Sequence, residues 1–391
     1  MANRRIIPAL LALALAGCGG GDLTSWLGSY SKEKPAELVP LTNAIAVSTL
    51  WSADVGAGND GRGVSLRPRV DGAVVYAADV KGRVSALDAA TGREIWKVDV
   101  DDEISGGPGS GDGLVLVGTV EGDVIALDAA TGARRWTSRV TSEVLSAPAA
   151  AQGVVVVHSL DGRVTGLDAA DGKQRWRYER LSSGLGLRGS SSPVISGGKA
   201  ICGLAGGKLV ALELATGFAV WETTITLPAG RTELERVVDI LGDPLLLAGQ
   251  VFVGTYQGEV AALYESNGQV AWRRKVSSYS ALASDGSLLF VSDDQSLVWA
   301  VDSRDGAALW KQDALRGRKL SAPAAFGGWV VVGDFEGHLH WLSPQDGQLV
   351  GRTRVGSAPI TAQPEAVNGT LYVLGDDGDL AALRVAGGAA P

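Results

Sequence analysis

Hydrophobic and polar positions alternate along this chain in a unit that repeats at a fixed interval. Trp96, Trp136 and Trp176 are each 40 residues apart. Every unit has an apolar run, a glycine, an alternating segment such as "VSALD", a turn sequence such as "ATG" or "DG", and a segment with a tryptophan. Alternation with period two is typical of a β-strand, and Gly, Asp and Thr between two such segments indicate a turn. Each unit therefore predicts about four short strands, the size of one propeller blade.

Eight copies of the unit can be aligned. Their alternating segments cover residues 82–96, 122–136, 162–176, 207–221, 258–272, 296–310, 337–351 and 378–387. The seventh copy has Gly351 in place of the tryptophan, and the eighth stops before its tryptophan segment, whereas Trp51 has a tryptophan segment with no unit before it. We therefore expect the segment around Trp51 to complete the last blade. The prediction is an all-β, eight-bladed β-propeller of four-stranded blades over residues 42–386; a seven-bladed ring is the alternative and leaves one repeat unassigned.

The repeated tryptophans and aspartates have a structural interpretation. A tryptophan at one fixed position in each unit predicts a packing element between neighbouring blades. The aspartates before the "TG" or "DG" turns are expected to accept hydrogen bonds from turn backbone; they are Asp88, Asp128, Asp168 and Asp302. Cys202 lies in an apolar run and is expected in the core.

The first residues resemble a bacterial lipoprotein signal. Arg4 and Arg5 precede a short apolar stretch, which ends in Leu15-Ala16-Gly17-Cys18. The resemblance implies that residues 1–17 are removed and that Cys18 carries lipid, with Gly19 favouring the outer membrane; an ordinary secretory signal is the alternative. Residues 18–41 are rich in Gly, Ser, Pro and charge and predict a tether, and residues 387–391 a C-terminal tail. The net charge of −8 argues against nucleic acid as a partner.

Little in the sequence indicates catalysis. His338 and His340 are two apart on a predicted strand and could share a metal, but no third ligand is near in sequence. No nucleophile elbow, phosphate loop or H-E-x-x-H motif occurs. The repeat resembles that of the PQQ-dependent quinoprotein dehydrogenases, but the adjacent cysteine pair of their alcohol-oxidising members is missing. We therefore expect no catalytic residue, cofactor or metal, and keep a quinone-dependent oxidoreductase as an alternative.

Two long connections depart from the repeat. The usual distance from the tryptophan position to the next unit's proline is 12 or 13 residues, but Pro193 is 17 after Trp176 and Pro244 is 23 after Trp221. Both connections join the outer strand of one blade to the next blade, so they should lie on one face of the ring. The first offers Leu185, Leu187 and Arg188, and the second Glu233, Glu235, Arg236 and Asp239. Apolar anchors beside an arginine are typical of protein interfaces; alternatively the loops pack on each other, with Arg188 paired to Asp239 or Glu235.

The signal, the eight repeats and the motifs "LGLRGSSSP", "GRTELERVVD" and "GDFEGHLHWL" together resemble the BamB family, lipoproteins of the outer-membrane β-barrel assembly (BAM) machinery. The resemblance implies a non-enzymatic scaffold at the periplasmic face of the outer membrane. It implies contact with the POTRA domains of BamA through Leu185, Leu187, Arg188 and Asp239, with Glu235 and Arg236 close by. Leu241 stands where the family pattern has a second acid. Unfolded β-barrel clients are possible further partners, through strand addition at a blade edge. A glycan-binding or structural envelope propeller is a further alternative.

Overall fold

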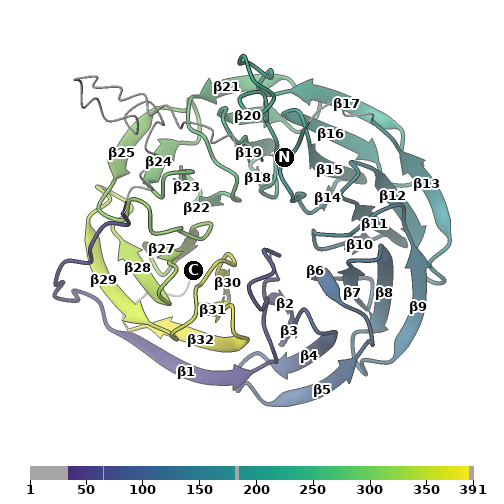
Figure 1. Ribbon diagram of the computed structural model, residues 1–391, viewed down its shortest axis with the longest axis horizontal. Coiled ribbons are helices and arrows are strands. Elements are labelled where there is room, and N and C mark those ends of the chain that lie inside the picture. Colours follow the sequence, from purple (N-terminus) through teal and green to yellow (C-terminus); the bar gives the residue numbers. More distant parts are fainter. Residues whose placement is uncertain (1–33, 65, 181–184, 387–391) are drawn as a thin grey trace, which may run out of the picture. The chain divides into compact units, whose positions relative to one another are not determined.

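The computed structural model describes residues 34–64, 66–180 and 185–386. The expected signal peptide, the lipidation site at Cys18, most of the expected tether and the C-terminal tail lie outside these residues. Within them the chain is all-β, with 32 strands in eight four-stranded antiparallel sheets. The sheets are arranged as the blades of one ring (Figure 1). The eight-bladed propeller is confirmed. No helix in the described part of the chain has the length and apolar character needed to cross a bilayer.

Each blade begins at the centre of the ring and ends at its rim, and we number the blades in chain order. Blade 1 holds β2 (Arg69–Asp71), β3 (Val74–Ala78), β4 (Arg83–Asp88) and β5 (Glu94–Asp99). Blade 2 holds β6 (Ile104–Gly111), β7 (Leu114–Thr119), β8 (Asp123–Asp128) and β9 (Arg134–Arg139). Blade 3 holds β10 (Ala149–Ala151), β11 (Val154–His158), β12 (Val164–Asp168) and β13 (Gln174–Tyr178). Blade 4 holds β14 (Val194–Ser196), β15 (Lys199–Leu204), β16 (Lys208–Glu213) and β17 (Ala219–Thr224).

The remaining blades follow the same order, except the last. Blade 5 holds β18 (Leu245–Leu247), β19 (Gln250–Gly254), β20 (Val260–Tyr264) and β21 (Val270–Arg274). Blade 6 holds β22 (Ala283–Ser284), β23 (Leu288–Ser292), β24 (Val298–Asp302) and β25 (Ala308–Gln312). Blade 7 holds β26 (Ala324–Phe326), β27 (Trp329–Gly333), β28 (His338–Leu342) and β29 (Leu349–Arg354). Blade 8 holds β30 (Glu365–Val367), β31 (Thr370–Leu374), β32 (Asp379–Val385) and, as its outer strand, β1 (Val47–Asp54).

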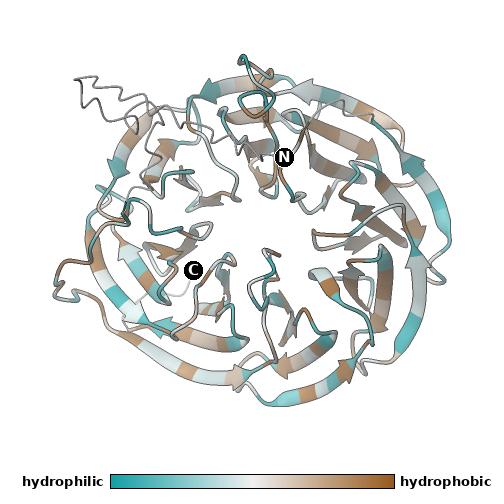
Figure 2. Cartoon of the chain, in the orientation of Figure 1, coloured by the Kyte–Doolittle hydropathy of each residue, from teal (hydrophilic) through white to brown (hydrophobic). Residues whose placement is uncertain are grey.

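The ring closes through the first strand of the chain. β1 pairs with β32 from Val47↔Val385 to Asp54↔Asp379. This pairing gives blade 8 the outer strand that its own unit lacks, as expected from the sequence. The middle strands of each blade are buried, whereas the outer strands carry polar bands (Figure 2). The core therefore lies between consecutive blades around the whole ring.

Seven tryptophans seal neighbouring blades, which confirms their packing role. Each indole N–H donates to a backbone carbonyl of the next blade, at 2.8–3.0 Å; the donors are Trp51, Trp96, Trp136, Trp176, Trp221, Trp272 and Trp310. Each indole ring also packs on the glycine of the turn between the third and fourth strands of the next blade. A Cβ on Gly92 would lie 2.6 Å from the Trp51 ring, so the position requires glycine. The four expected aspartates accept turn N–H groups, and Cys202 is buried.

Blade 7 replaces its missing tryptophan with a residue from outside the repeat. A Cβ added to Gly351 would lie 2.8 Å from Ile45 Cγ1, so Ile45 occupies the space beside this glycine. Ile45 belongs to the segment 36–46, which we name the strap. The strap lies beside β29 (Figure 1), where Ala44 N–H donates to the Val350 carbonyl at 2.7 Å. At the other end of the strap, the Ala36 N–H donates to the Arg316 carbonyl and the Ala36 carbonyl accepts a hydrogen bond from Arg318. Residues 36–41, which were expected in the tether, therefore belong to a segment that is bound to the propeller.

Candidate functional site

The two long loops lie on adjacent blade junctions and contact each other. The first loop (residues 179–193) joins β13 to β14, and the second loop (residues 225–244) joins β17 to β18; residues 181–184 lie outside the described part. Strand direction alternates within a blade, so these connections share a face with the turn between the second and third strands of each blade. We call this the loop face. The backbone N–H of Leu187 donates to the Asp239 carboxylate at 2.7 Å, so the two loops meet directly.

Asp239 is the centre of this contact. It is 3% exposed, and its second carboxylate oxygen accepts the N–H of Gly206 in the β15–β16 turn at 3.0 Å. Its own carbonyl accepts the N–H of Tyr256 from the next blade at 3.0 Å. A buried carboxylate is favourable only when hydrogen bonds replace its water, and here backbone N–H groups do so. Asp239 therefore fixes the backbone of Leu187 through a hydrogen bond, and its charge is not exposed at the surface.

The residues expected at the partner contact differ in exposure. Leu185 is 62% exposed, whereas Leu187 is half-buried and lines a cavity of about 220 Å³ between the two loops. The Arg188 guanidinium forms a 2.6 Å ion pair with Glu143, in the loop between blades 2 and 3. Its other nitrogen approaches the carbonyls of Arg62 and Gly63 at 3.4 Å. Arg188 thus crosses blade 3 along the loop face.

Neither pair expected from loop-on-loop packing, Arg188 with Asp239 or Arg188 with Glu235, forms within the described residues. Glu235 instead closes a helix-like turn in its own loop. Its carboxylate accepts the N–H groups of Arg231 at 2.6 Å and Thr232 at 3.2 Å, while Thr232 Oγ1 accepts the Glu235 N–H at 3.2 Å. This reciprocal arrangement is a capping box. The bonds from the Arg231 and Thr232 backbone lower the pKa of Glu235.

Arg236 also acts within the second loop. Its Nε donates to the Gly230 carbonyl at 3.1 Å, and its guanidinium lies 3.5 Å from Glu233. Both Glu235 and Arg236 are exposed. Their side chains therefore shape the loop while staying accessible on its surface.

Three further residues of this region are not singled out by the sequence patterns. Leu227 is 75% exposed and Leu234 is 71% exposed, both in the second loop. Each is a single leucine, Leu227 beside a proline and Leu234 among charged residues, and a single leucine in a sequence is indistinguishable from a packed position. Glu143 belongs to a short connection of ordinary length and gives no signal. Together with Leu185, the two leucines make the contacting loops rich in exposed apolar side chains.

Leu241 packs against the first loop. A Cβ on Gly189 would lie 3.3 Å from Leu241 Cδ2, and Leu241 is half-buried. It also lines a cavity of about 150 Å³ on the ring axis, next to Asp243. An acid at this position would place a second carboxylate near Asp243, so the leucine suits its surroundings.

The axis of the ring is crossed by an ion pair. Arg67, in the connection between blades 8 and 1, pairs with Asp243 at the end of the second loop. Asp243 also accepts the Ser192 N–H at 2.6 Å, and Arg67 reaches Gln363 at 3.5 Å. Connections from opposite sides of the ring are therefore joined at its centre.

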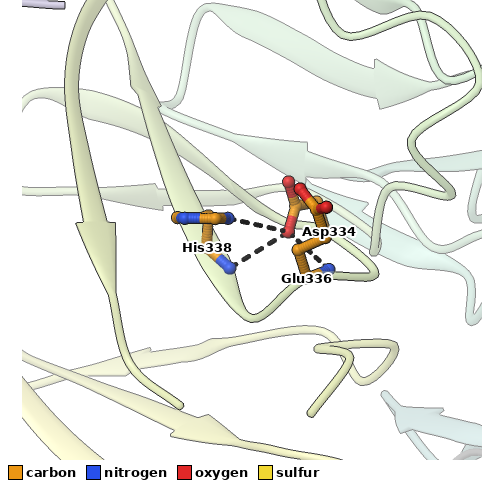
Figure 3. A group of neighbouring side chains, drawn as sticks. All are labelled: Asp334, Glu336 and His338. Carbon is orange, nitrogen blue, oxygen red and sulfur yellow. Dashed lines mark hydrogen bonds and ion pairs between the residues drawn. The ribbon is translucent and has the colours of Figure 1, made fainter. Parts of the chain in front are cut away.

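One group of side chains has the composition of a metal site: Asp334, Glu336 and His338, in and after the β27–β28 turn (Figure 3). Asp334 already accepts the backbone N–H groups of Glu336 and His338 at 2.9 and 3.0 Å. Its other oxygen accepts Arg318 Nε at 2.9 Å and faces His340 Nε2 at 2.8 Å. Arg318 also bonds Glu336. A guanidinium between the two carboxylates supplies the positive charge that a metal would bring, so these residues form an ion-pair network around the buried Asp334 and fit a metal poorly.

A further cavity lies away from the loops. It has a volume of about 770 Å³ and is lined by the turns between the first two strands of blades 6, 7 and 8, with Phe326, Trp329 and Arg384 among its residues. These turns are at the opposite strand ends from the loop face. The cavity is therefore separate from the candidate partner site.

Comparison with known proteins agrees with the repeat and the ring. Residues 80–312 and 296–390 match the family model described as outer membrane protein assembly factor BamB. The chain belongs to the BamB family. A relative from Pseudomonas aeruginosa, named outer membrane protein assembly factor BamB, is 52% identical over 96% of this chain and 98% of its own length. The relative of the same name from Alkalilimnicola ehrlichii is 50% identical over 98% of this chain and 97% of its own length.

One solved structure supports the same family, and a second shares the fold. The crystal structure of BamB from Moraxella catarrhalis matches with a TM-score of 0.80 and 26% identity, over 87% of this chain and all of that one. A quinohemoprotein alcohol dehydrogenase from Comamonas testosteroni matches with a TM-score of 0.66 at 16% identity, over 89% of this chain and 78% of that one. The second likeness shows a shared propeller fold and nothing about activity. The BamB relatives carry the name of an assembly factor and not of an enzyme.

Proposed function

We propose that this chain is a non-enzymatic scaffold lipoprotein of the BAM complex, which assists insertion of β-barrel proteins into the outer membrane. Its BamB relatives are named for outer membrane protein assembly. The signal-like residues 1–17 and Cys18 support a lipid anchor that holds the ring, residues 42–386, at the periplasmic face of the outer membrane. A rigid ring without a catalytic constellation among its described residues suits a scaffold.

The partner site of this proposal is the pair of long loops, which bind the POTRA domains of BamA. One observation supports this site most. The buried Asp239 holds the two loops together through hydrogen bonds, while the side chains of Leu185, Leu227 and Leu234 on these loops are 62–75% exposed. Exposed apolar side chains on a fixed backbone lose little conformational entropy on binding. Leu187 lines the cavity between the two loops, and Arg188 supplies the charged anchor.

Arg188 is already paired with Glu143, and this affects how it would bind. Glu143 is 12% exposed, so the pair sits at the edge of the loop face with the guanidinium the more accessible member, at 46%. A partner carboxylate can share the guanidinium without breaking the existing pair, because arginine has five N–H donors. Removal of Arg188 then weakens binding and also leaves Glu143 unpaired.

The test is capture of a purified BamA POTRA fragment by the mature chain. Wild type should bind, and Arg188→Ala and Leu185→Asp should each weaken binding by about 2 kcal/mol, roughly thirtyfold. Arg139→Ala is the matched control, because Arg139 is an exposed, ion-paired arginine on the rim of blade 2. Equal capture by all four proteins would exclude this site, and absence of capture by wild type would exclude the proposed role.

A further inference from the structure

Trp329 lies outside the tryptophan pattern of the repeat. It is the first residue of β27 and follows the turn between the first two strands of blade 7. The residues at this position in blades 1 to 6 and in blade 8 are Val74, Leu114, Val154, Lys199, Gln250, Leu288 and Thr370. None of them is aromatic, so the blade itself does not require an aromatic residue here.

The indole N–H of Trp329 has no acceptor among the described residues. Nine of the ten tryptophans in this part of the chain donate their N–H to a protein oxygen, including Trp299 to Asp293 and Trp341 to Thr353. Trp329 is the tenth, and its side chain is half-buried. A tryptophan that packs within a fold usually has a partner for its N–H. The position therefore suits contact with a molecule from outside the chain.

Trp329 lines the cavity of about 770 Å³ at the turns of blades 6, 7 and 8. This volume falls within the range of small-molecule sites, roughly 300–1,000 Å³. Phe326 and Val385 contribute apolar walls, and the Gly327-Gly328 turn before Trp329 has no side chain that would cover the indole. The cavity is thus large enough for a ligand and has an aromatic surface to pack against it.

Three polar side chains of the cavity wall have unused hydrogen-bonding groups. Arg384 is exposed, and its guanidinium forms no hydrogen bond or ion pair with the described residues. Asp285 uses one carboxylate oxygen for the N–H groups of Ser287 and Leu288, and its other oxygen has no partner among the same residues. The exposed Asn368 amide supplies both a donor and an acceptor. Together they offer donors and acceptors without net charge.

This combination selects a neutral ligand that donates and accepts hydrogen bonds and also has an apolar face. A charged ligand would be attracted by one of Arg384 and Asp285 and repelled by the other. A purely apolar ligand would leave the three polar groups unpaired beneath it, which costs free energy. A saccharide has the required chemistry, because its hydroxyl groups donate and accept while the C–H groups on one face of the sugar ring pack on an indole.

We propose that this cavity binds a short oligosaccharide. One sugar ring packs on the face of Trp329, and its hydroxyl groups bond Arg384, Asp285 and Asn368. The cavity is at the opposite strand ends from the loop face, so a glycan and a protein on the two long loops can be bound together. The proposal does not depend on the proposed BamA contact.

The test titrates the isotope-labelled mature chain with maltotriose, cellotriose and chitotriose. At least one of them should shift the Trp329 indole N–H resonance in a saturable way. The indole resonance of Trp96, whose N–H is bonded to the Ala129 carbonyl, should stay in place. This comparison separates binding at the cavity from a general effect of the sugar on the protein.

Two substitutions in the cavity wall complete the test. Arg384→Met and Trp329→Leu should each weaken binding of that sugar at least tenfold, measured by saturation transfer from protein to sugar. The fold should tolerate Trp329→Leu, because blades 2 and 6 have leucine at this position. Arg304→Met is the matched control, since Arg304 is an exposed arginine on the same face that does not line the cavity.

Each outcome decides the proposal. Binding that is lost in Arg384→Met and Trp329→Leu and kept in Arg304→Met, at unchanged melting temperatures, supports it. Absence of binding by all three sugars, or equal effects of the three substitutions, would overturn it. Binding that is also lost in Arg188→Ala would contradict a site separate from the loop face.

The chain's own residues 387–391 are the competing occupant, because they follow the cavity wall at Val385. A chain shortened to residue 386 distinguishes the two. A Trp329 resonance that moves on shortening, and does not move when sugar is added to either chain, would overturn the proposal in favour of the tail. A resonance that moves with sugar in the shortened chain supports the glycan site.

Discussion

Arg67 and Asp243 form an ion pair across the axis of the ring, although 176 residues separate them in the chain. The Asp243 charge raises the pKa of Arg67. The side chains are 30% and 18% exposed, so the pair is shielded from water but not fully buried. We expect Arg67→Met to lower the free energy of unfolding by about 1–3 kcal/mol, because it leaves Asp243 without its cation.

Chemical denaturation measures this change, and Arg69→Met provides the comparison. Arg69 is 47% exposed and lies 3.9 Å from Glu365, so its loss should cost less than about 1 kcal/mol. An Arg67→Met protein as stable as wild type would show that the axial pair does not hold the ring together.

Asp239→Ala should loosen both long loops. The substitution leaves the N–H groups of Leu187 and Gly206 without an acceptor, at a cost of about 1–3 kcal/mol. Amide hydrogen exchange at these two residues should accelerate, and Glu233→Ala, at an exposed position of the same loop, should leave it unchanged. Protection that persists in Asp239→Ala would contradict the bracing role.

Gly351→Trp restores the repeat sequence but should destabilise the protein. Ile45 already occupies the space beside Gly351, and overpacking of this kind typically costs about 1–3 kcal/mol. Ile45→Gly combined with Gly351→Trp should recover part of that loss, because the new indole then has room. Thermal unfolding of the single and double variants tests this; additive losses would show that the two positions do not share one space.

Cys202 should be unreactive in the folded protein. Burial raises the pKa of its thiol to about 12, so little thiolate is present at neutral pH, and its side chain is inaccessible. A thiol reagent at pH 8 should label a chain that begins after Cys18, with Cys202 as its single cysteine, only after denaturant is added. Rapid labelling of the native protein would show that blade 4 opens locally.

Stability should fall as the pH drops below about 6.5. Burial lowers the pKa of both His158 and His340 below the ordinary 6.5, so the unfolded chain binds protons that the folded chain does not. Their contribution is therefore complete above pH 6.5 and is lost on acidification. Melting temperatures between pH 7.5 and 5 should decline less steeply in His158→Gln with His340→Gln than in wild type.

A second group extends this decline at lower pH. Burial alone would raise the pKa of Asp334, but bonds from His340, the His338 backbone and Arg318 outweigh it and hold the pKa below its usual range. The stability that Asp334 contributes is present above its ordinary pKa and is lost as the pH falls through the lowered value. A melting temperature independent of pH from 7.5 to 3 would contradict both expectations.

The blade count and the ring closure could be predicted from the sequence because the residues of each repeat interact mainly within one blade or with the next blade. Each alternating strand, each turn aspartate and each tryptophan has its function within one unit or against the next, so spacing alone identifies them. Ile45 could not be predicted, since it fills a vacancy in blade 7 from a segment before the first strand. Only the closed ring brings these two stretches together.

The positions of the two long loops could be predicted from the sequence, but their contacts could not. Loop lengths located the two long connections on neighbouring blade junctions. Arg188, however, pairs with Glu143 from another blade, and Asp239 is buried beneath Leu187. These contacts depend on the curvature of the ring and on the path of each loop, which the spacing of residues does not specify. The charges of Arg188 and Asp239 suggested an ion pair between the loops. In the structure, the Asp239 carboxylate instead accepts hydrogen bonds from backbone N–H groups.

The pairing of β1 with β32 also determines the order in which the molecule can be completed. β1 is the first strand to be synthesised and β32 is the last, and Val47 meets Val385. β1 therefore stays without its partner strand until nearly the whole chain has been synthesised. Contacts so distant in sequence form slowly because closing a long loop costs entropy. A chain that ends before residue 379 leaves β1 without its partner, so every shortened product carries an open, unfinished ring.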